Sequence, residues 1–339
     1  MRARPWRRAA PPARVLAIRL HALGDTVLTL PWLDALRRSL PGGTLDFLTR
    51  EEVAGIPGSV VLFDRVHEIG GGRTPSRMLL KALRLVPRLR RRRYDVVVDL
   101  QRSRISRIVR RLLRPAAWSE FDRLSPRTAA ERTRETIEAA GLGPLEIRPG
   151  LKLRDPGLGA DVLSAAGWNG ADPLVVLNPA GTFPARRWPL EAHARFAEHW
   201  LEREPGTRFL VLGLASLSPA AAVLRERLGG RLLDLTGRTR AAEAFAALGR
   251  VELVLTEDSG LMHMAAAAGA PTLALFGGSR VAWSAPQGPR SDWMRACERA
   301  DGDCIDGRCR ASRPTCLERL GPEAVLERAV ALRERAHRG

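Results

Sequence analysis

The chain has 339 residues, more than one hydrophobic core usually spans, so two domains are expected. Its apolar fraction of 45% is typical of a folded protein, and no run of about 18 apolar residues is long enough to cross a membrane. Residues 1–150 hold 30 Lys and Arg against 15 Asp and Glu, so this half carries +15 of the net charge of +18. Such a surface attracts nucleic acid, anionic lipid headgroups or a phosphorylated glycan.

The first residues are basic, and we expect residues 1–13 to form a disordered arm. The stretch Ala9–Leu20 is broken by prolines and arginines and therefore lacks the apolar core of a signal peptide. This predicts a cytoplasmic protein.

The first predicted strand, Val15–Leu20, leads into His21, Gly24 and Asp25 at the start of a helix. Asp is a favoured N-cap residue, so Asp25 could simply cap this helix. A carboxylate at the end of a parallel strand could instead act as a general base toward a substrate hydroxyl. The spacing alone leaves both interpretations open.

The rest of the first half alternates strands and helices, which predicts a domain over residues 14–143. Further strands are expected at 44–48, 60–63 and 94–100, and helices at 26–40, 75–92, 103–113 and 128–140. Arginines cluster in Arg88–Arg93 and again in Arg102–Arg114. These runs could bind an anionic surface, or could form a solvated face enriched by genome composition. The chain has one Tyr and no aromatic residues interleaved with basic ones, which argues against nucleic acid as the partner.

Glycines and prolines are dense in residues 144–159, which predicts a linker. The alternation then resumes and predicts a second domain over 160–320, followed by a C-terminal helix within 321–339. Strands are expected at 174–178, 208–213, 231–235, 251–256 and 272–276, and helices at 190–203, 219–228, 240–249 and 260–268. Two α/β, doubly wound domains facing across a cleft are therefore expected.

The strand Leu174–Asn178 runs into a loop with Gly181, Thr182, Arg186 and Arg187. Backbone N–H groups, a hydroxyl and two guanidinium groups suit a diphosphate that departs as a leaving group. The alternative is a surface loop with solvated arginines and a packed Trp188.

The strand Val251–Thr256 leads into Asp258, Ser259, Gly260 and, one turn later, His263. Asp258 or Ser259 would cap the helix that follows, and free N–H groups at a helix start can hold a phosphate. A capped helix with an incidental histidine is the plain alternative.

Four segments together resemble glycosyltransferase family 9, the bacterial ADP-heptose:lipopolysaccharide heptosyltransferases and their relatives. They are R-V-L-A-I-R-L-H-A-L-G-D, N-P-A-G-T-F-P-A-R-R-W-P, D-L-T-G-R-T and E-D-S-G-L-M-H-M-A-A-A-A-G-A-P-T-L-A-L-F-G, in that order over residues 14–278. The resemblance implies a GT-B fold in which the N-terminal domain binds the acceptor and the C-terminal domain binds the nucleotide sugar. It also implies transfer with inversion, without a bound metal or another cofactor.

Carried onto this sequence, the resemblance makes Asp25 the catalytic base, with His21 and Gly24 on the acceptor side. Thr182, Arg186 and the neighbouring Arg187 would hold the donor phosphates, and the donor sugar would lie at a helix-start motif. That motif consists of Asp258, Ser259, Gly260 and His263. Arg186 stands where relatives often have Lys, and because arginine keeps its proton, its role would be electrostatic.

The implied reaction moves a heptose from ADP-heptose to the lipopolysaccharide core, on a lipid A–Kdo or heptose acceptor. The partners would be the nucleotide sugar, a lipid-linked phosphorylated glycan and the anionic inner face of the inner membrane, where the protein would be peripheral. Alternatives are another nucleotide sugar or surface-glycan acceptor, or a non-enzymatic protein that binds nucleotide sugar or anionic lipid.

Four cysteines occur near the end of the chain, at Cys297, Cys304, Cys309 and Cys316. Disulfides are disfavoured in the cytoplasm, and the spacing lacks the close pairs of common zinc sites. Reduced thiols, a structural zinc and a redox bridge therefore remain as alternatives.

Overall fold

A computed structural model of the chain describes residues 2–72, 74–181, 186–296 and 316–338. It divides into two compact units, Met1–Arg154 and Asp155–Gly339. The boundary lies within residues 144–159, the segment in which the sequence predicts a linker.

The first unit is built on one six-stranded sheet, in the order β1-β6-β5-β2-β3-β4. All neighbouring strands are parallel except β1, which runs antiparallel to β6. The strands are β1 (Ala3–Arg4), β2 (Arg14–Ile18), β3 (Thr44–Arg50), β4 (Arg65–Ile69), β5 (Val96–Asp99) and β6 (Ala117–Glu120). Continuous apolar runs such as Val96–Val98 are buried, as expected of parallel strands covered on both faces.

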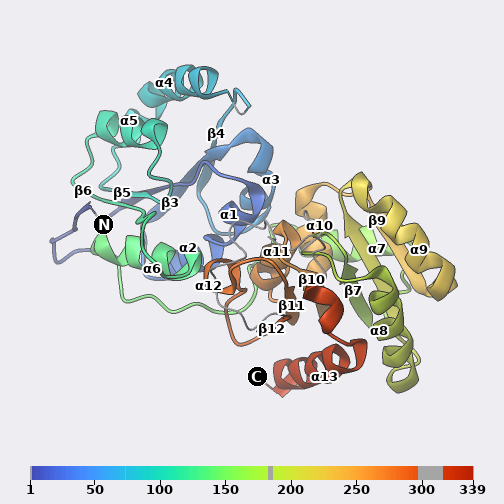
Figure 1. Cartoon of the computed structure of the whole chain (residues 1–339). Helices are drawn as coiled ribbons and strands as arrows, with labels where there is room; N and C mark the ends of the chain where they lie inside the picture. The colour runs from blue at the N-terminus through green and yellow to red at the C-terminus, as the bar shows by residue number, and fades with distance from the viewer. Residues whose placement is uncertain (1, 73, 182–185, 297–315, 339) are drawn as a thin grey trace. The chain divides into compact units, whose positions relative to one another are not determined.

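Helices cover both faces of this sheet (Figure 1). They are α1 (Leu23–Val27), α2 (Leu30–Arg38), α3 (Gly55–Ser59), α4 (Pro75–Arg91), α5 (Arg104–Leu113) and α6 (Ala129–Ala139), with a 3₁₀ turn at Glu51–Val53. On one face, α4 and α5 pack together and bury Val86, Leu89 and Val109 against the strands. The other face carries α2 and α6.

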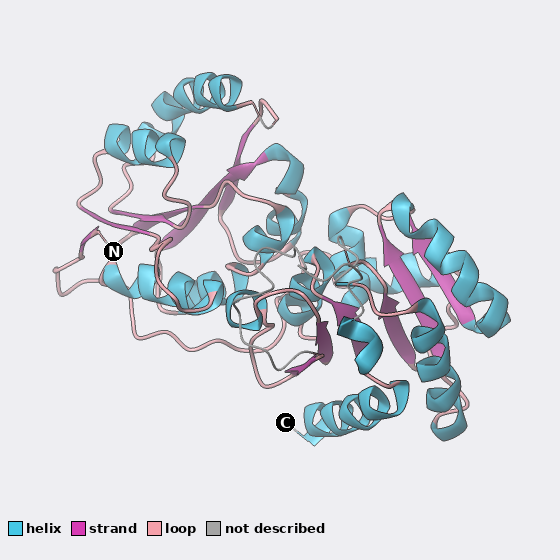
Figure 2. Ribbon diagram, in the orientation of Figure 1, coloured by secondary structure: helices cyan, strands magenta, loops and turns pink. Residues whose placement is uncertain are grey.

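The second unit has a fully parallel sheet in the order β12-β11-β10-β7-β8-β9. Its strands are β7 (Leu174–Asn178), β8 (Arg208–Gly213), β9 (Leu232–Thr236), β10 (Leu253–Glu257), β11 (Thr272–Phe276) and β12 (Ser291–Arg295). Its helices are α7 (Leu158–Ala165), α8 (Leu190–Arg203), α9 (Ser218–Leu228), α10 (Ala241–Leu248), α11 (Gly260–Ala268), α12 (Val281–Ser284) and α13 (Pro322–Arg338). Figure 2 shows the strands of each unit enclosed between helices. Short 3₁₀ turns lie at Ala215–Leu217, Gly229–Arg231 and Cys316–Arg319.

Each sheet reverses its winding at one pair of strands. In the first unit β2 has β3 on one side and β5 on the other, and in the second β7 lies between β8 and β10. Ligands of such sheets bind beyond the carboxyl ends of the strands at this reversal. The predicted α/β, doubly wound class is therefore confirmed, and the reversals locate the candidate sites.

The amino-terminal residues differ from the expected disordered arm. Ala3 pairs with Ser119 and Arg4 with Trp118, which extends the sheet by one antiparallel strand. The backbone N–H of Trp6 also donates to the Ala140 carbonyl at 2.8 Å. Without β1, backbone N–H and C=O groups of β6 would lie unpaired at the sheet edge. Pairing with these groups fixes the amino-terminal residues.

The C-terminal helix is likewise part of the second unit and not a separate element. Leu326, Ala329 and Leu332 of α13 are buried in the same core as Trp200 of α8. The helix α7 begins within the expected linker, and a Cβ on Gly159 would lie 2.4 Å from the Ala246 carbonyl oxygen. Gly159 therefore allows α7 to pack closely against α10, and it belongs to a helix and not to a linker.

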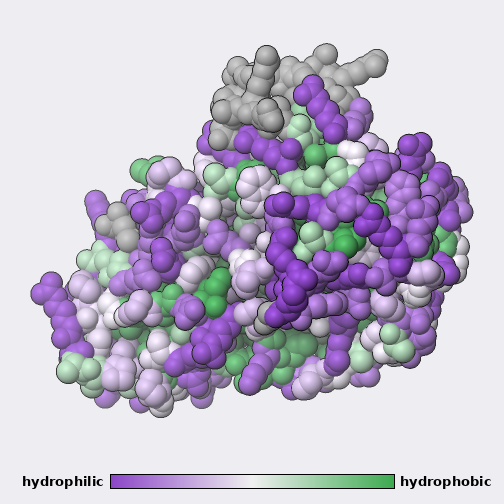
Figure 3. All heavy atoms as spheres, turned by 90° about the horizontal axis from the view of Figure 1, so that it is seen from below, coloured by the Kyte–Doolittle hydropathy of each residue, from purple (hydrophilic) through white to green (hydrophobic). Residues whose placement is uncertain are grey.

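Other differences concern element boundaries. The single helix expected over 26–40 is divided into α1 and α2, with Pro31 in the first turn of α2. The strand expected at 60–63 is only one bridge, between Val60 and Leu153, and β4 follows it. In the part of the chain that the structure describes, no helix is both long enough and apolar enough to span a bilayer. On the face drawn in Figure 3, hydrophilic side chains surround smaller apolar patches.

Candidate functional site

Asp25 lies in the first turn of α1, beyond the carboxyl end of β2. The residue at the N-cap position is Ala22, so the capping interpretation of Asp25 is wrong. Its carboxylate is instead held by two side chains: Arg19 Nη2 lies 3.0 Å from Oδ1, and His21 Nδ1 lies 2.6 Å from Oδ2. The Asp25 side chain is 38% exposed and can still meet a substrate.

Arg19 is one of the site residues that sequence reasoning missed. Arg19 is buried, and its Nη1 atom donates a hydrogen bond to the Leu100 carbonyl at the end of β5. Burial lowers the pKa of Arg19, and the charge of Asp25 opposes this shift. Arg19 therefore fixes Asp25 relative to both strands at the winding reversal. The available signal was a cation inside the apolar run Val15–Leu20 that was predicted as a strand, because a buried cation requires a partner.

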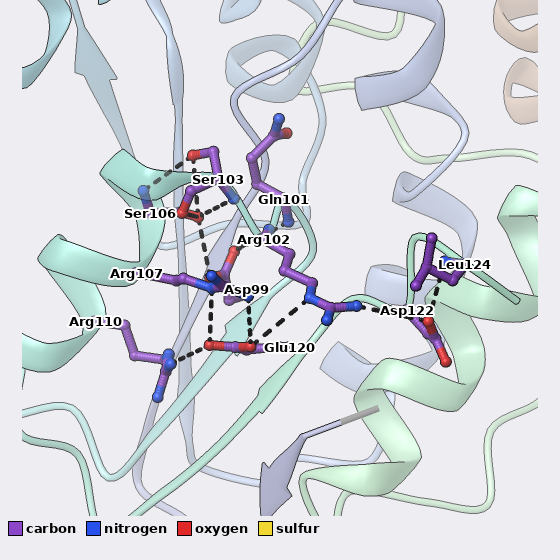
Figure 4. A network of polar contacts seen from close by, with 10 residues as sticks. All are labelled: Asp99, Gln101, Arg102, Ser103, Ser106, Arg107, Arg110, Glu120, Asp122 and Leu124. Carbon is purple, nitrogen blue, oxygen red and sulfur yellow. Dashed lines mark hydrogen bonds and ion pairs between the residues drawn. The ribbon is translucent and has the colours of Figure 1, made fainter.

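The end of β5 is organised by Asp99, a buried carboxylate (Figure 4). Its Oδ1 accepts the backbone N–H groups of Gln101 at 3.0 Å and Arg102 at 2.8 Å, and its Oδ2 accepts the Ser106 hydroxyl at 3.0 Å. Burial raises the pKa of Asp99, while these donors act in the opposite direction. Arg102 has φ of 51°, a left-handed conformation that is uncommon for a residue with a side chain.

Glu120, at the end of β6, pairs with arginines of α5 and of the loop before it. Arg102 and Arg107 lie 4.0 and 3.4 Å from its carboxylate, and Arg110 donates to it directly (Figure 4). Part of the arginine run 102–114 is thus neutralised within the fold.

In the second unit, Asn178 joins the carboxyl ends of β7 and β10. Its buried amide donates to the Thr256 hydroxyl at 2.7 Å and to the Ser259 hydroxyl at 2.9 Å. Ser259 occupies the N-cap position of α11, but its side chain forms no capping hydrogen bond. The predicted helix start is correct, whereas the predicted Ser259 side-chain cap is replaced by a contact with Asn178.

Arg186 and Asp258 form an ion pair beside that helix start. Arg186 Nη1 lies 3.2 Å from Asp258 Oδ2, and the two side chains are only 21% and 9% exposed. Arg187 is exposed and its Nε donates to the Gly181 carbonyl at 2.9 Å. Of the two adjacent arginines, Arg186 is therefore the one that lies at α11. Thr182 lies outside the described residues.

A buried carboxylate, Glu257, holds the loop after β7. One of its oxygens accepts the backbone N–H of Gly181, and the other accepts that of Trp188 at 2.5 Å. Burial raises the pKa of Glu257 to about 8, against these two donors and the charge of Arg187. The predicted strand ended at Thr256, so sequence reasoning gave Glu257 no role, whereas it is the last residue of β10.

Gly181 is needed where this loop meets the strand ends. A Cβ at this position would lie 2.2 Å from the Arg186 carbonyl oxygen and 2.6 Å from Glu257 Oε2. Such contacts are far below van der Waals distance, so only glycine fits without rearrangement.

Gly260 opens α11 and His263 lies one turn into it, partly buried. Asn178 contacts Ser259, and Arg186 contacts Asp258, so this end of the second sheet combines a helix N-terminus, hydroxyl and amide groups and an ion-paired cation. Those are the groups that bind a phosphate or diphosphate.

The four cysteines are the candidate ligands for a structural zinc. Cys297, Cys304 and Cys309 lie outside the described residues, and Cys316 begins a 3₁₀ turn. Among the described residues, no group of three or more His, Cys, Asp or Glu is placed to hold a metal ion.

Comparisons with known proteins identify the family of the chain. Residues 82–313, more than half of the chain, match the model of glycosyltransferase family 9 (heptosyltransferase). Lipopolysaccharide heptosyltransferase 1 of Pseudomonas aeruginosa is 27% identical over 94% of this chain and 98% of its own length. Lipooligosaccharide heptosyltransferase 2 of Haemophilus influenzae is 31% identical over 38% of each chain.

Solved structures share the fold. A family 9 glycosyltransferase from Veillonella parvula superposes with a TM-score of 0.79 at 19% identity, covering 95% of this chain and 97% of its own. ADP-heptose lipopolysaccharide heptosyltransferase II of Escherichia coli superposes with a TM-score of 0.74 at 19% identity, covering 96% and 99%. The predicted GT-B class is confirmed by this likeness together with the two doubly wound sheets, and the chain belongs to glycosyltransferase family 9.

Proposed function

We propose that this protein is an inverting, metal-independent heptosyltransferase that moves a heptose from ADP-heptose to the lipopolysaccharide core, on a lipid A–Kdo or heptose acceptor. The observation that carries the proposal is the similarity to the P. aeruginosa lipopolysaccharide heptosyltransferase 1, which extends over 94% of this chain and 98% of the relative. A similar E. coli heptosyltransferase, with a TM-score of 0.61, was solved with ADP.

In the proposed reaction Asp25 is the base. The acceptor hydroxyl attacks the anomeric carbon, its proton passes to the Asp25 carboxylate, and the bond from that carbon to the diphosphate breaks. A single displacement of this kind inverts the anomeric configuration. Arg19 and His21 orient the carboxylate by contacts of 3.0 and 2.6 Å, which suits a base that must meet one hydroxyl.

In the same reaction ADP leaves with the bonding electrons and gains negative charge at its terminal phosphate. Arg186, positioned by Asp258, and the N-terminus of α11 would stabilise this charge, with Ser259 as a further donor. Because these groups supply fixed positive charge, the proposal needs no divalent cation at the diphosphate. Transferase activity should therefore persist after EDTA treatment and dialysis. A requirement for Mg²⁺ would contradict the proposed metal independence.

The donor and acceptor are tested by direct assay. The protein is incubated with ADP-heptose and either lipid A–Kdo or a heptose-extended core, and the product is identified by mass spectrometry and its anomeric configuration by NMR. UDP- and GDP-sugars, with another surface glycan as acceptor, test the alternative of a different transfer. Nucleotide-sugar binding without product from any pair would favour the non-enzymatic alternative.

The proposed acceptor is lipid-linked, so the protein would work as a peripheral protein on the cytoplasmic, inner face of the inner membrane. The basic character of residues 1–150 supports attraction to anionic headgroups. Arg88, Arg90 and Arg91 are exposed at the end of α4 and are available for this contact, whereas Arg92 is paired with Asp46 at 3.2 Å.

Sedimentation with vesicles tests this surface. Replacing Arg88, Arg90 and Arg91 by alanine should weaken binding to anionic vesicles, by about 1 kcal/mol per arginine at low salt. Binding should fall as salt is raised, because the charges are screened. Equal, salt-independent pelleting with neutral and anionic vesicles would contradict the proposal.

A further inference from the structure

A pocket of about 480 Å³ lies at the β1–β6 edge of the first unit's sheet. It is lined by five arginines and the ring of Trp118. The arginines come from two places far apart in the sequence: Arg2 and Arg4 from the amino-terminal strand, and Arg110, Arg111 and Arg114 from the end of α5. None of these residues belongs to the groups around Asp25 or Asp258.

The amino-terminal segment is held firmly enough to form a wall of this pocket. Glu120 N–H donates to the Arg2 carbonyl at 2.9 Å, in continuation of the β1–β6 ladder. Trp6 is docked on the end of α6, where Gly141 has φ of 83° and a Cβ would lie 2.6 Å from the Trp6 carbonyl oxygen. The arginines of this segment therefore have fixed backbone positions.

The charge of the pocket is poorly balanced. Its one lining carboxylate, Glu120, is already shared by Arg102, Arg107 and Arg110. Within the ranges that the structure describes, no carboxylate lies within ion-pair distance of the exposed Arg2, Arg4, Arg111 or Arg114. Burial lowers the pKa of Arg110 while the charges of Glu120 and Asp99 oppose this shift, so Arg110 is balanced by these carboxylates, unlike the four exposed arginines. Cations held together without counter-charges repel one another, and a bound anion would relieve that repulsion.

A second pocket of about 470 Å³ shares Arg4 with the first. It is lined by Trp6, Arg7 and Arg8, and the Arg8 guanidinium lies 5.0 Å from the centre of the Trp6 ring. In the first pocket the Arg110 guanidinium lies 3.7 Å from the Trp118 ring. The stacked arginines have restricted orientations, which favours planar, bidentate contacts with oxyanions.

We propose that this pair of pockets binds phosphate groups, with Arg4 between two neighbouring anionic positions. The chemistry fits a diphosphate or a pair of phosphomonoesters, carried by a lipid headgroup or by a soluble phosphorylated molecule. A guanidinium covers one face of the Trp118 ring and another covers one face of the Trp6 ring, so these faces are not open for base stacking, and the two adjoining arginine pockets suit a pair of phosphate groups. The site deepens the proposed membrane contact by naming the group bound, and it can be tested without any transfer assay.

The test compares two triple variants with the same net charge. Arg4, Arg111 and Arg114 are replaced by alanine in one, and Arg88, Arg90 and Arg91 on α4 in the other. Both are made in an Arg186→Ala background, so that the proposed donor site contributes little to phosphate binding. Inorganic pyrophosphate is titrated by calorimetry at low salt, and thermal unfolding is recorded for each protein.

The pocket triple variant should bind pyrophosphate at least tenfold more weakly than its parent, and the α4 triple variant should bind it equally well. If the pocket variant does not fold, the charge reversal Arg111→Glu takes its place. Equal affinities in the two variants, or no pyrophosphate binding by the parent, would overturn the proposal. Arginine-dependent binding of duplex DNA without pyrophosphate binding would also overturn it, in favour of nucleic acid.

Vesicles distinguish the two sources of phosphate. Phosphatidylcholine vesicles containing phosphatidic acid are compared with vesicles containing an equal fraction of phosphatidylserine. Preference for phosphatidic acid that is lost in the pocket variant supports a lipid headgroup, and its absence alongside pyrophosphate binding supports a soluble ligand. With the native Arg186 restored, transfer to a lipid-free acceptor should be unchanged by the pocket substitutions, which separates this proposal from the proposed function.

Discussion

Replacing Glu257 by glutamine tests whether a buried carboxyl group organises the donor-side loop. In the native protein both oxygens accept backbone N–H groups, from Gly181 and Trp188. Glutamine keeps one acceptor and turns an NH₂ group toward the other donor. At pH 6 a carboxyl group with a pKa of about 8 is protonated and, like glutamine, has only one carbonyl oxygen, so the free energies of unfolding of the native protein and of Glu257→Gln should agree within about 1 kcal/mol at that pH.

The difference should depend on pH in a defined direction. The pKa of Glu257 is raised from 4.5 to about 8, so between these values the folded state holds a proton that the unfolded state has lost. The stabilisation is complete below pH 4.5 and falls by about 1.4 kcal/mol per pH unit up to pH 8. Glutamine does not titrate. The native protein should therefore lose about 2 kcal/mol relative to the variant between pH 6 and 7.5.

Urea unfolding followed by tryptophan fluorescence measures this difference, and Trp188, whose N–H contacts Glu257, is a buried reporter. The two curves are recorded at pH 6, 7.5 and 9. A difference in free energy of unfolding that stays constant between pH 6 and 7.5 would refute the reasoning, because the raised pKa would then be absent.

Two further substitutions test the donor side. Gly181→Ala should destabilise the protein by about 1–3 kcal/mol and weaken ADP binding, because its Cβ would lie 2.2 Å from a carbonyl oxygen. Thermal unfolding and calorimetry check this against Gly206→Ala, whose Cβ meets nothing within 4 Å. Arg186→Ala should weaken ADP binding about 10- to 100-fold, since a charge-assisted contact to the diphosphate is lost. Arg187→Ala, which removes an exposed side chain, should weaken it less, and the reverse order would show that the two arginines are wrongly assigned.

The strand ends could be predicted from the sequence because the buried strands are continuous apolar runs. Leu174–Asn178 and Thr272–Phe276 were predicted with the boundaries that the structure has. β12 escaped prediction because its sequence, S-D-W-M-R, has no apolar run and its side chains are partly exposed. β1 depends on pairing with β6, which is distant in the sequence, and local residues carry no signal of such a contact.

Several residues of the candidate site were predicted from the sequence, but the contacts between them were not. Asp25, Arg186 and Asp258 were singled out because they lie in the segments between predicted strands and the helices that follow them. The partners that fix them, such as Arg19 for Asp25 and Glu257 for the loop at Gly181, act through contacts that the fold creates. The sequence shows ionisable residues at the strand ends, but it does not show which way their side chains point.

The most direct test of the account is the turnover of Asp25→Ala with ADP-heptose and a lipid A–Kdo or heptose acceptor, measured together with ADP affinity. If Asp25 is the base held by Arg19 and His21, turnover should fall by about 10²–10⁴-fold while ADP affinity stays near its native value; thermal stability should fall as well, because the buried Arg19 loses this partner. Turnover within about twofold of the native enzyme, well below the effect expected of a positioned base, would contradict the central claim.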